Sequence, residues 1–289
     1  MISAQRSVEV ILAGQAPSGA YVASPAFAPY DYCWFRDGAF IADAMRESGH
    51  GDSAHRFFDW CAQVIHARPA GPWDARYQLD GTADTSEWAL HQVDGLGLYL
   101  GALRRAGRWD ESADVVARWL ADHWHEPCTD WWEEREGVHA VTLWCVGNGL
   151  QSDEIKREAL ARVDDRLDGS LLFIGTPEIV ERVEAQLVSP GGGVWRHLED
   201  DYYGGGEWLL LTALLGLAYA DQGRLDDARR CLAWIEDRAT PDGLPEQVRE
   251  HLLRPDRYEP WVERWGEPAC PLLWSHAMHL RLCHAVGHG

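Results

Sequence analysis

The stretch YDYCWFRD, residues 30–37, leads directly into a helical pattern over residues 37–48. A second stretch, DWWEER at residues 130–135, has the same mixture of aromatic rings with acidic and basic groups. Aromatic faces cover the apolar C–H patches of a sugar ring, and charged side chains form strong hydrogen bonds with its hydroxyls. A carboxyl held against apolar rings also has a raised pKa, which suits a proton donor. The two stretches therefore predict a pocket for a neutral, polyhydroxylated molecule.

Small and apolar residues recur at intervals of three and four along most of the chain, which is the pattern of amphipathic helices. The predicted helices cover residues 2–13, 37–48, 52–67, 84–106, 110–123, 142–150, 153–163, 176–188, 206–221, 224–238 and 268–286. Short turns alternate with long loops rich in Gly, Pro, Trp and charge, at residues 14–36, 68–83, 124–141, 189–205 and 239–267. We therefore predict an all-α chain of helical hairpins arranged in a ring, as one domain over residues 1–289, with function on the long loops. The helix pattern alone fits a generic helical bundle or solenoid equally well.

The composition is that of an acidic globular protein, with 289 residues, 46% hydrophobic residues and a formal net charge of −20. Phosphate binding needs clustered Lys and Arg, so we expect neither nucleic acid nor an anionic membrane surface as a partner. The seven cysteines are odd in number and form no CxxC pair, which favours a reducing compartment and predicts a cytoplasmic location. The sequence shows neither a signal-peptide pattern nor a run of about 18 apolar residues that could span a membrane.

Six fragments carry a more specific signal. They are SGAYVASP at 18–25, YDYCWFRD at 30–37, QLDG at 78–81, WWEER at 131–135, GGVWR at 192–196 with EDDYYGG at 199–205 and EW at 207–208, and LPEQ at 244–247. Each fragment is weak alone, but in this order they resemble glycoside hydrolase family 15, the glucoamylase-like enzymes. The resemblance implies an (α/α)6-type barrel and an inverting, exo-acting hydrolase without a cofactor. Such an enzyme would release glucose from the non-reducing end of short malto- or isomalto-oligosaccharides.

The resemblance also implies roles for two carboxyls. Glu133 matches the general acid of the family and Glu246 the general base. Inversion needs two carboxyls roughly 6.5–9.5 Å apart, with room for one water, so we expect these two side chains to converge on a cavity. Glu134 is the rival for the acid position, and the family gives this second glutamate a sugar-binding role. Trp131 and Trp132 are of the type that would desolvate the acid. On the residues alone, Glu133 and Glu134 could be a surface pair, and Glu246 could be an acid at a helix N-terminus.

The remaining site residues follow from the same resemblance. Arg36 and Asp37 match residues that hold the terminal glucose. On the residues alone, they could instead form an ion pair at the start of a helix. Tyr30 matches a tyrosine that helps to hold the attacking water, or it is a core aromatic residue. The other predicted substrate-binding residues are Trp34, Trp73 and Trp132 as sugar platforms, Asp80, and Arg196. The chain has 16 Trp, so most of them must belong to the core.

Histidine and cysteine spacing gives a weaker signal. His123 and His125, and the set His276, His279, Cys283 and His284, have spacings seen in metal sites, but the sequence contains no HExxH. We therefore predict no metal, and we expect these side chains on solvated or core-satisfied helix faces.

The chain departs from the family pattern in length. Roughly 60 residues separate Glu133 from Arg196, about half of what the family has there. We therefore expect one hairpin to be reduced or missing, with ten or eleven helices in place of twelve. Two further functions stay open at this point, a trehalase-like α-glucosidase of the same family and a non-catalytic, glucan-binding regulatory domain. The presence of both Glu133 and Glu246 argues against the regulatory domain, because a binding module does not need the pair.

Overall fold

The computed structural model describes residues 2–86, 88 and 91–287. These residues form twelve α-helices, three short 3-10 helices and three small antiparallel sheets. The chain divides into two compact units, and each is described by itself. We call residues 13–23 and 31–164 the N-terminal unit, and residues 1–12, 24–30 and 165–289 the C-terminal unit.

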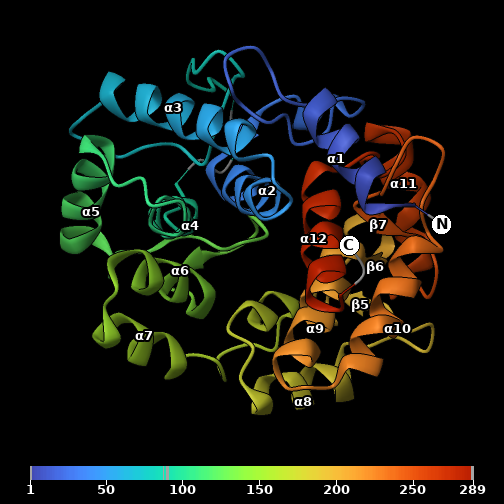
Figure 1. Cartoon of the computed structure of the whole chain (residues 1–289). Coiled ribbons are helices and arrows are strands. Elements are labelled where there is room, and N and C mark those ends of the chain that lie inside the picture. The colour runs from blue at the N-terminus through green and yellow to red at the C-terminus, as the bar shows by residue number, and fades with distance from the viewer. Residues whose placement is uncertain (1, 87, 89–90, 288–289) are drawn as a thin grey trace. The chain divides into compact units, whose positions relative to one another are not determined.

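The N-terminal unit consists of six helices and two small two-stranded antiparallel sheets, and its helices are labelled in Figure 1. Its elements are β1 (Cys33–Trp34), α2 (Phe35–Glu47), α3 (Gly51–Ala67), β2 (Arg76–Tyr77), α4 (Asp94–Arg105), α5 (Glu111–His123), β3 (Cys128–Thr129), β4 (Glu136–Gly137), α6 (Ala140–Leu150) and α7 (Asp153–Leu160). Helix α4 contacts both α2 and α6. Eleven of the 13 residues of α2 and ten of the 12 residues of α4 are buried, against eight of 17 in α3 and four of 13 in α5. A helix buried on all sides lies inside and a half-buried one outside, so consecutive helices alternate between two layers.

The C-terminal unit repeats this contrast. Its elements are α1 (Ala4–Ala13, except its last residue), η1 (Ala28–Tyr30), η2 (Gly169–Phe173), α8 (Pro177–Gln186), β5 (Val194–Trp195), η3 (Tyr202–Gly204), β6 (Glu207–Trp208), α9 (Leu209–Asp221), α10 (Leu225–Glu236), β7 (Gln247–Val248), α11 (Pro255–Trp265) and α12 (Leu273–Ala285). Helices α9 and α12 each bury ten of 13 residues, and α10 buries five of 12. Helix α9 contacts both α10 and α12, and the strand order of the sheet is β5-β6-β7.

Three predictions about the helices are wrong. The described residues form twelve α-helices, not ten or eleven. The helix predicted over residues 84–106 begins only at Asp94, and residues 87, 89 and 90 of that prediction lie outside the described residues. Helix α11 lies inside the predicted loop 239–267. It buries only Tyr258 and carries Pro260 in its interior, although Tyr258, Trp261, Val262 and Trp265 recur at helical spacing.

Helix α7 has eight residues, fewer than any other α-helix of the described residues, and it lies between Glu133 and Arg196 in the sequence. Helices are therefore present in this region, and their reduction relative to the family stays a prediction.

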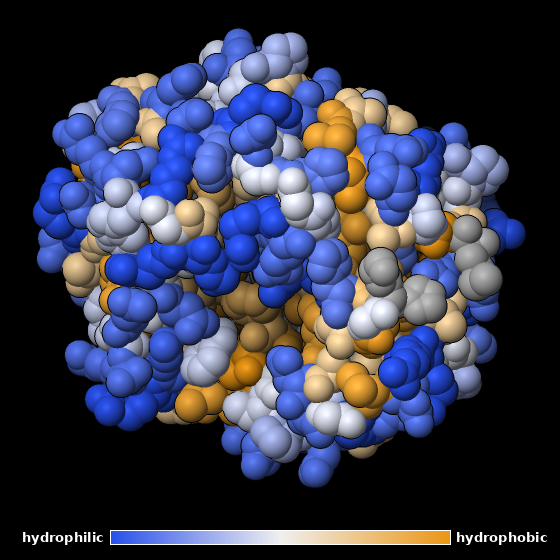
Figure 2. Space-filling model, in the orientation of Figure 1, coloured by the Kyte–Doolittle hydropathy of each residue, from blue (hydrophilic) through white to orange (hydrophobic). Residues whose placement is uncertain are grey.

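The described residues contain no helix that is long and apolar enough to cross a membrane. Hydrophilic residues predominate on the face shown in Figure 2, as expected from the high content of acidic residues.

Candidate active site

The loop that carries Glu133 is the tip of the β3–β4 hairpin. The buried Asp130 organises it, because its Oδ1 accepts hydrogen bonds from the backbone N–H of Glu134 (2.9 Å) and of Arg135 (3.3 Å). The N–H of Glu133 donates to the carbonyl of Asp130 at 3.0 Å. Glu133 itself has φ = 64°, a left-handed conformation that is uncommon for a residue with a side chain. Such backbone outliers cluster at functional sites, where the surrounding contacts enforce them.

The carboxyl group of Glu133 accepts three N–H donors. The indole Nε1 of Trp34 donates to Oε1 at 2.8 Å, and the Nη2 of Arg36 lies 3.5 Å from the same oxygen. The indole of Trp88 donates to Oε2. The side chain of Glu133 is only 13% exposed, whereas Glu134 is exposed, so the structure separates the two glutamates.

Arg36 connects Glu133 to a buried charge network. Its Nη1 donates to Oε1 of Gln92 (2.8 Å) and to Oδ2 of Asp94 (3.0 Å), and its Nε lies 3.7 Å from Oδ1 of Asp37. Burial raises the pKa of Asp37 to about 7, with Glu133 and Asp94 adding to the rise and Arg36 opposing it. A carboxyl with such a pKa exists in both protonation states near neutrality, and it can therefore donate as well as accept a hydrogen bond.

An arginine also orders the aromatic rings beside Glu133. The guanidinium of Arg76 lies over the rings of Trp88 (4.0 Å to the centroid) and Trp34 (5.0 Å). Its Nε donates to Oδ2 of Asp84 at 2.6 Å, which holds the cation in place. The cation–π contacts therefore orient the two indoles whose N–H groups face Glu133.

In the C-terminal unit, the backbone of Glu246 is hydrogen-bonded in both directions. Its N–H donates to the carbonyl of Ala269 at 2.8 Å, and its carbonyl accepts from the N–H of Leu209 at 3.2 Å. Glu246 is 2% exposed, and the hydroxyl of Tyr30 donates to its Oε1 at 2.9 Å. The hydroxyls of Tyr30 and Tyr202 lie 3.1 Å apart, so a chain of phenols leads to this carboxyl.

Arg196 lies on the far side of Tyr202. It forms a bidentate pair with Asp200, with Nε donating to Oδ2 at 2.8 Å and Nη2 donating to Oδ1. Its guanidinium is 5.2 Å from the centroid of the Tyr202 ring and 5.1 Å from that of Trp208. Burial, followed by the charge of Glu246, raises the pKa of Tyr202 well above its usual value, so this phenol stays protonated near neutrality.

The structure thus brings most predicted site residues into two clusters. Trp34, Arg36, Asp37 and Glu133 come together in the N-terminal unit. In the C-terminal unit, Tyr30 contacts Glu246, and Arg196 reaches the pair through the Tyr202 ring. Each cluster holds one carboxyl of the predicted catalytic pair.

Two predicted substrate-binding residues lie apart from these clusters. Trp73 is 1% exposed, donates to the carbonyl of Ile65 and packs against Trp119, so it is a core residue and we abandon its role as a sugar platform. Asp80 is exposed in a turn, where Oδ1 accepts the N–H of Thr82 at 2.8 Å. This backbone bond lowers the pKa of Asp80 and accounts for its place in the turn without a sugar.

The structure adds two rings to the predicted environment of Glu133. The indoles of Trp34 and Trp88 bond its carboxyl. Trp131 packs against Phe40 and, at 6.2 Å between ring centroids, against Trp132. The half-buried Trp132 remains available as a platform.

The residues missed by sequence reasoning are Trp88, Gln92 and Asp94 in the N-terminal unit and Asp200 and Tyr202 in the C-terminal unit. The first three fall in the segment that was predicted to be helical. The last two lie inside the fragment at 199–205. The charge of Asp200 and the hydroxyl of Tyr202 are the signals that could have identified them as site residues.

The histidines with metal-like spacing lie in different surroundings. His123 stacks on Trp119 and bonds its backbone carbonyl. Glu236, His279 and Cys283 place one ligand atom each within 4.8 Å of one another, and this is a group that could hold a metal ion by geometry alone.

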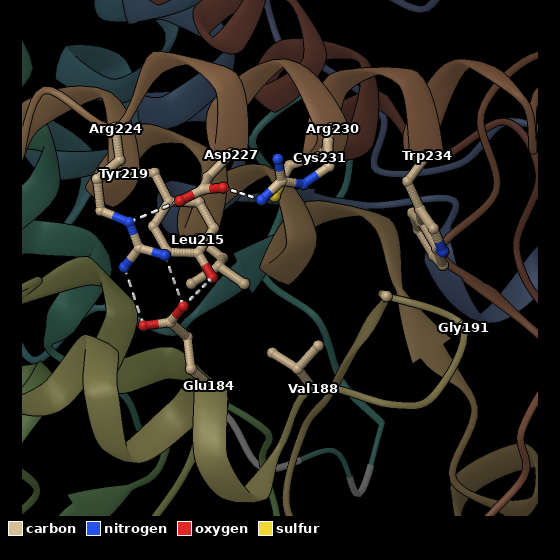
Figure 3. Close-up of a pocket in the computed structure, with 11 residues that line it drawn as sticks. Glu184, Val188, Gly191, Leu215, Tyr219, Arg224, Asp227, Arg230, Cys231 and Trp234 are labelled. Atoms are coloured by element: carbon tan, nitrogen blue, oxygen red, sulfur yellow. Dashed lines mark hydrogen bonds and ion pairs between the residues drawn. The ribbon is translucent and has the colours of Figure 1, made fainter.

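A pocket of about 300 Å³ lies in the C-terminal unit between α8, α9 and α10 (Figure 3). The guanidinium of Arg224 bonds both oxygens of Glu184, at 3.0 and 2.8 Å, and Asp227 at 2.7 Å. Arg230 also bonds Asp227. These charges are directed at one another and not into the pocket, so the arrangement serves to hold the helices together.

Comparisons with known proteins identify similar sequences and similar solved structures. The sequence model of "Glycosyl hydrolases family 15" matches residues 3–152. The isomaltose glucohydrolase of Kribbella flavida is 34% identical over an alignment of 355 positions that covers 98% of this chain and 92% of the relative. Since this chain has 289 residues, the relative carries segments with no counterpart here.

Solved structures extend the likeness. A glycosidase variant in complex with glucose is 34% identical and covers 99% of this chain and 96% of that chain, with a TM-score of 0.85. A bacterial glucoamylase in complex with acarbose is 19% identical and has a TM-score of 0.76, covering 99% of this chain and 55% of that chain. These likenesses establish the all-α, (α/α)6-type fold class that the sequence predicts.

Proposed function

Because this chain belongs to family 15 of the glycosyl hydrolases and is therefore a glycoside hydrolase, we propose that it is an inverting, exo-acting α-glucosidase. It would release glucose from the non-reducing end of short isomalto-oligosaccharides. The observation that carries the proposal is that each unit holds one motif glutamate in a largely buried, hydrogen-bonded cluster, Glu133 in one and Glu246 in the other. The 34% identity to an isomaltose glucohydrolase supports the choice of isomaltose over maltose.

The proposed reaction assigns one proton transfer to each carboxyl. Glu133 gives its proton to the glycosidic oxygen as the bond to the sugar breaks, and Glu246 takes a proton from the water that attacks the anomeric carbon. The three N–H donors around Glu133 stabilise the carboxylate that remains after its proton has left. The hydroxyl of Tyr30, bonded to Glu246, is placed to help hold the water.

The other proposed roles concern the bound glucose. Asp37 and Arg36 would bind its hydroxyls, and the pKa of Asp37, about 7, allows this carboxyl to donate or to accept. Trp34 and Trp132 would cover the apolar face of the sugar. Glu134 and Arg196 complete the proposed set of substrate-binding residues.

A glucose-release assay tests the proposal. Wild type is incubated with isomaltose, maltose, maltotriose and trehalose, and the anomer first released is followed by proton NMR. We expect the highest kcat/KM with isomaltose and β-glucose as the first product, because attack from the opposite face inverts the configuration. Glu133→Gln and Glu246→Gln should lose activity by about two to four orders of magnitude, since each removes one proton transfer. Glu136→Gln, an exposed glutamate of the same hairpin, is the matched control.

Other outcomes would point elsewhere. Activity on trehalose alone indicates the trehalase-like alternative, and α-glucose as the first product excludes inversion. Binding of oligosaccharide without release of glucose from any of the four substrates would contradict the proposal.

A further inference from the structure

The backbone that leads into Glu246 is held by two side chains of helix α12. The hydroxyl of Ser275 donates to the carbonyl of Pro245 at 2.8 Å, and the N–H of Leu244 donates to Nε2 of His276 at 2.9 Å. Both side chains are buried, with Ser275 1% exposed and His276 0% exposed. Two neighbouring residues of one helix therefore bond the two residues that immediately precede Glu246.

The contact between helix and loop is close. Gly243 has φ = 139°, and a side-chain carbon at this position would lie 2.6 Å from Nε2 of His276. Glycine is thus required both by the backbone conformation and by the imidazole beside it. Any larger residue would displace either the ring or the loop.

The tautomer of His276 follows from its partners. Burial, with His279 and Arg6 adding to it, lowers the pKa of His276 to about 3, so the ring is neutral near neutrality. Its Nε2 accepts a backbone N–H, which is always a donor, so the single ring proton is assigned to Nδ1. Nδ1 lies 2.9 Å from the hydroxyl oxygen of Ser7, which accepts this proton.

The same reasoning extends to His279. The hydroxyl of Ser7 accepts from His276, so its own proton is directed to Nδ1 of His279, also at 2.9 Å. In a neutral His279 the proton then resides on Nε2, which lies 3.6 Å from a carboxylate oxygen of Glu236 and 3.4 Å from the sulfur of Cys283. This nitrogen is therefore a donor, and for this reason we interpret Glu236, His279 and Cys283 as the end of a hydrogen-bond chain and not as a metal site.

We propose that Ser275 and His276 are positioning residues for Glu246, and that Ser7 fixes the tautomer of His276 that can accept the loop. The inference rests on the proposed function, because positioning has a kinetic meaning only if Glu246 is the general base. A base that activates water must be held within a fraction of an ångström of its productive position. Hydrogen bonds with α12 on one side, and with the backbone of Ala269 and Leu209 at Glu246 itself, supply that restraint.

Kinetics in two backgrounds test this proposal. We expect His276→Leu to lower kcat on isomaltose by about 10- to 100-fold with KM changed less than about twofold, because the base is displaced while the sugar contacts remain. His276→Gln should recover most of the loss, since its amide oxygen can accept the N–H of Leu244. In the Glu246→Gln background, His276→Leu should lower the rate by less than about twofold, because there is no base left to position.

Ser275→Ala is the second variant, with Ser112→Ala as its matched control. Ser112 is equally buried and bonds the hydroxyl of Tyr99 in the N-terminal unit, so it reports the loss of a buried serine far in sequence from the base. Ser275→Ala should lower kcat by about 5- to 30-fold, and Ser112→Ala should leave it within about twofold. An equal loss in both variants, or an equal loss for His276→Leu in both backgrounds, would mean a general structural role and would overturn the inference.

Hydrogen exchange gives a readout independent of catalysis. The peptide covering residues 243–248 should exchange at least about tenfold faster in Ser275→Ala and His276→Leu than in wild type, while peptides of α5 stay unchanged. Unchanged exchange over residues 243–248 overturns the inference. A wild type that releases no glucose yet shows this faster exchange in the variants would contradict the proposed function and leave the restraint from α12 intact.

Discussion

Glu133 and Glu246 are held in different ways by the two units. Glu133 sits at a hairpin tip with a left-handed backbone, and its carboxyl faces N–H donors within a network of buried charges. Glu246 is hydrogen-bonded through both its backbone N–H and its backbone carbonyl, and its carboxyl accepts a hydrogen bond from a phenol. The proposed acid is thus positioned mainly through its side chain, and the proposed base mainly through its main chain.

The difference has a chemical counterpart. The acid changes from neutral to charged as the reaction proceeds, and the fixed donors around Glu133 favour the charged product of that change. The base has to hold a water molecule in one place, and a rigid backbone with neutral hydroxyl neighbours serves that purpose. The comparison therefore predicts different responses to substitution in the two clusters.

The largest expected effect is on the rate of hydrolysis of two substrates with different leaving groups. It distinguishes the proposed acid from the proposed base. Glu133→Gln should lose about 10²- to 10⁴-fold in kcat/KM on isomaltose but retain most of its activity on α-D-glucosyl fluoride, because fluoride leaves without a proton. Glu246→Gln should lose activity on both substrates, since water still has to be deprotonated. Steady-state rates of glucose and fluoride release measure both. The opposite pattern would exchange the roles of the two glutamates, and equal losses for both variants on both substrates would contradict the assignment.

A smaller effect is expected when one hydrogen-bond donor to either carboxyl is removed. Removing one hydrogen bond to a charged group costs about 1.5–3 kcal/mol, which corresponds to about 10- to 150-fold in rate. Tyr30→Phe should fall in this range, because Tyr30 donates the hydrogen bond that the structure shows at Oε1 of Glu246. Trp88→Phe should cost less, since Trp34 and Arg36 still face Glu133.

Tyr21→Phe is the control for these two variants. Its hydroxyl is buried and bonds Ser53 at 2.7 Å, without contact to either glutamate. Its kcat should stay within about twofold of wild type, since no group at either carboxyl is changed. A larger loss in Trp88→Phe than in Tyr30→Phe would show that Trp34 and Arg36 do not compensate for the missing donor at Glu133.

Much of the fold was accessible from the sequence because the inner helices are distinctive. Helices such as α6 and α9 are apolar almost throughout, whereas α3 and α10 carry one apolar face, and periodicity distinguishes both from loops. Helix α11 was missed although its apolar residues have helical spacing, because Pro255 and Pro260 are signals for a loop. The prediction of ten or eleven helices in place of twelve rested on counting residues. It was wrong because a helix can be as short as α7 and still be present.

The site was accessible only where chemistry and motif coincide. Glu133 and Glu246 stand in recognisable fragments, and the structure separates Glu133 from Glu134 by burial. Trp73 was assigned wrongly because an indole looks the same in sequence whether it packs in the core or faces a ligand. Asp94 and Gln92 were missed because their role depends on a long-range contact with Arg36, and no local pattern encodes such a contact.

The smallest effect concerns the charges that distinguish the N-terminal cluster. The folded-state pKa of Asp37, raised by burial to about 7, lies above its value of about 3.9 in an unfolded chain. Between these values the folded state binds more protons than the unfolded state. Asp37 therefore contributes stability that is fully present below about pH 4 and is lost as pH rises through about 7.

Urea unfolding at pH 5, 6, 7 and 8 measures this contribution. The free energy of unfolding of wild type should fall relative to that of Asp37→Asn as pH rises, by at most about 1.4 kcal/mol per pH unit, the limit for one proton. Asp59→Asn, which removes one negative charge at an exposed position, is the matched control variant. The phenol of Tyr202, whose pKa is raised well above 10 by burial and Glu246, does not titrate between pH 5 and 8. A difference between wild type and Asp37→Asn that stays constant over the same range would place the charge of Asp37 outside the buried network, and would remove one of the buried charges that distinguish the surroundings of Glu133 from the phenol that bonds Glu246.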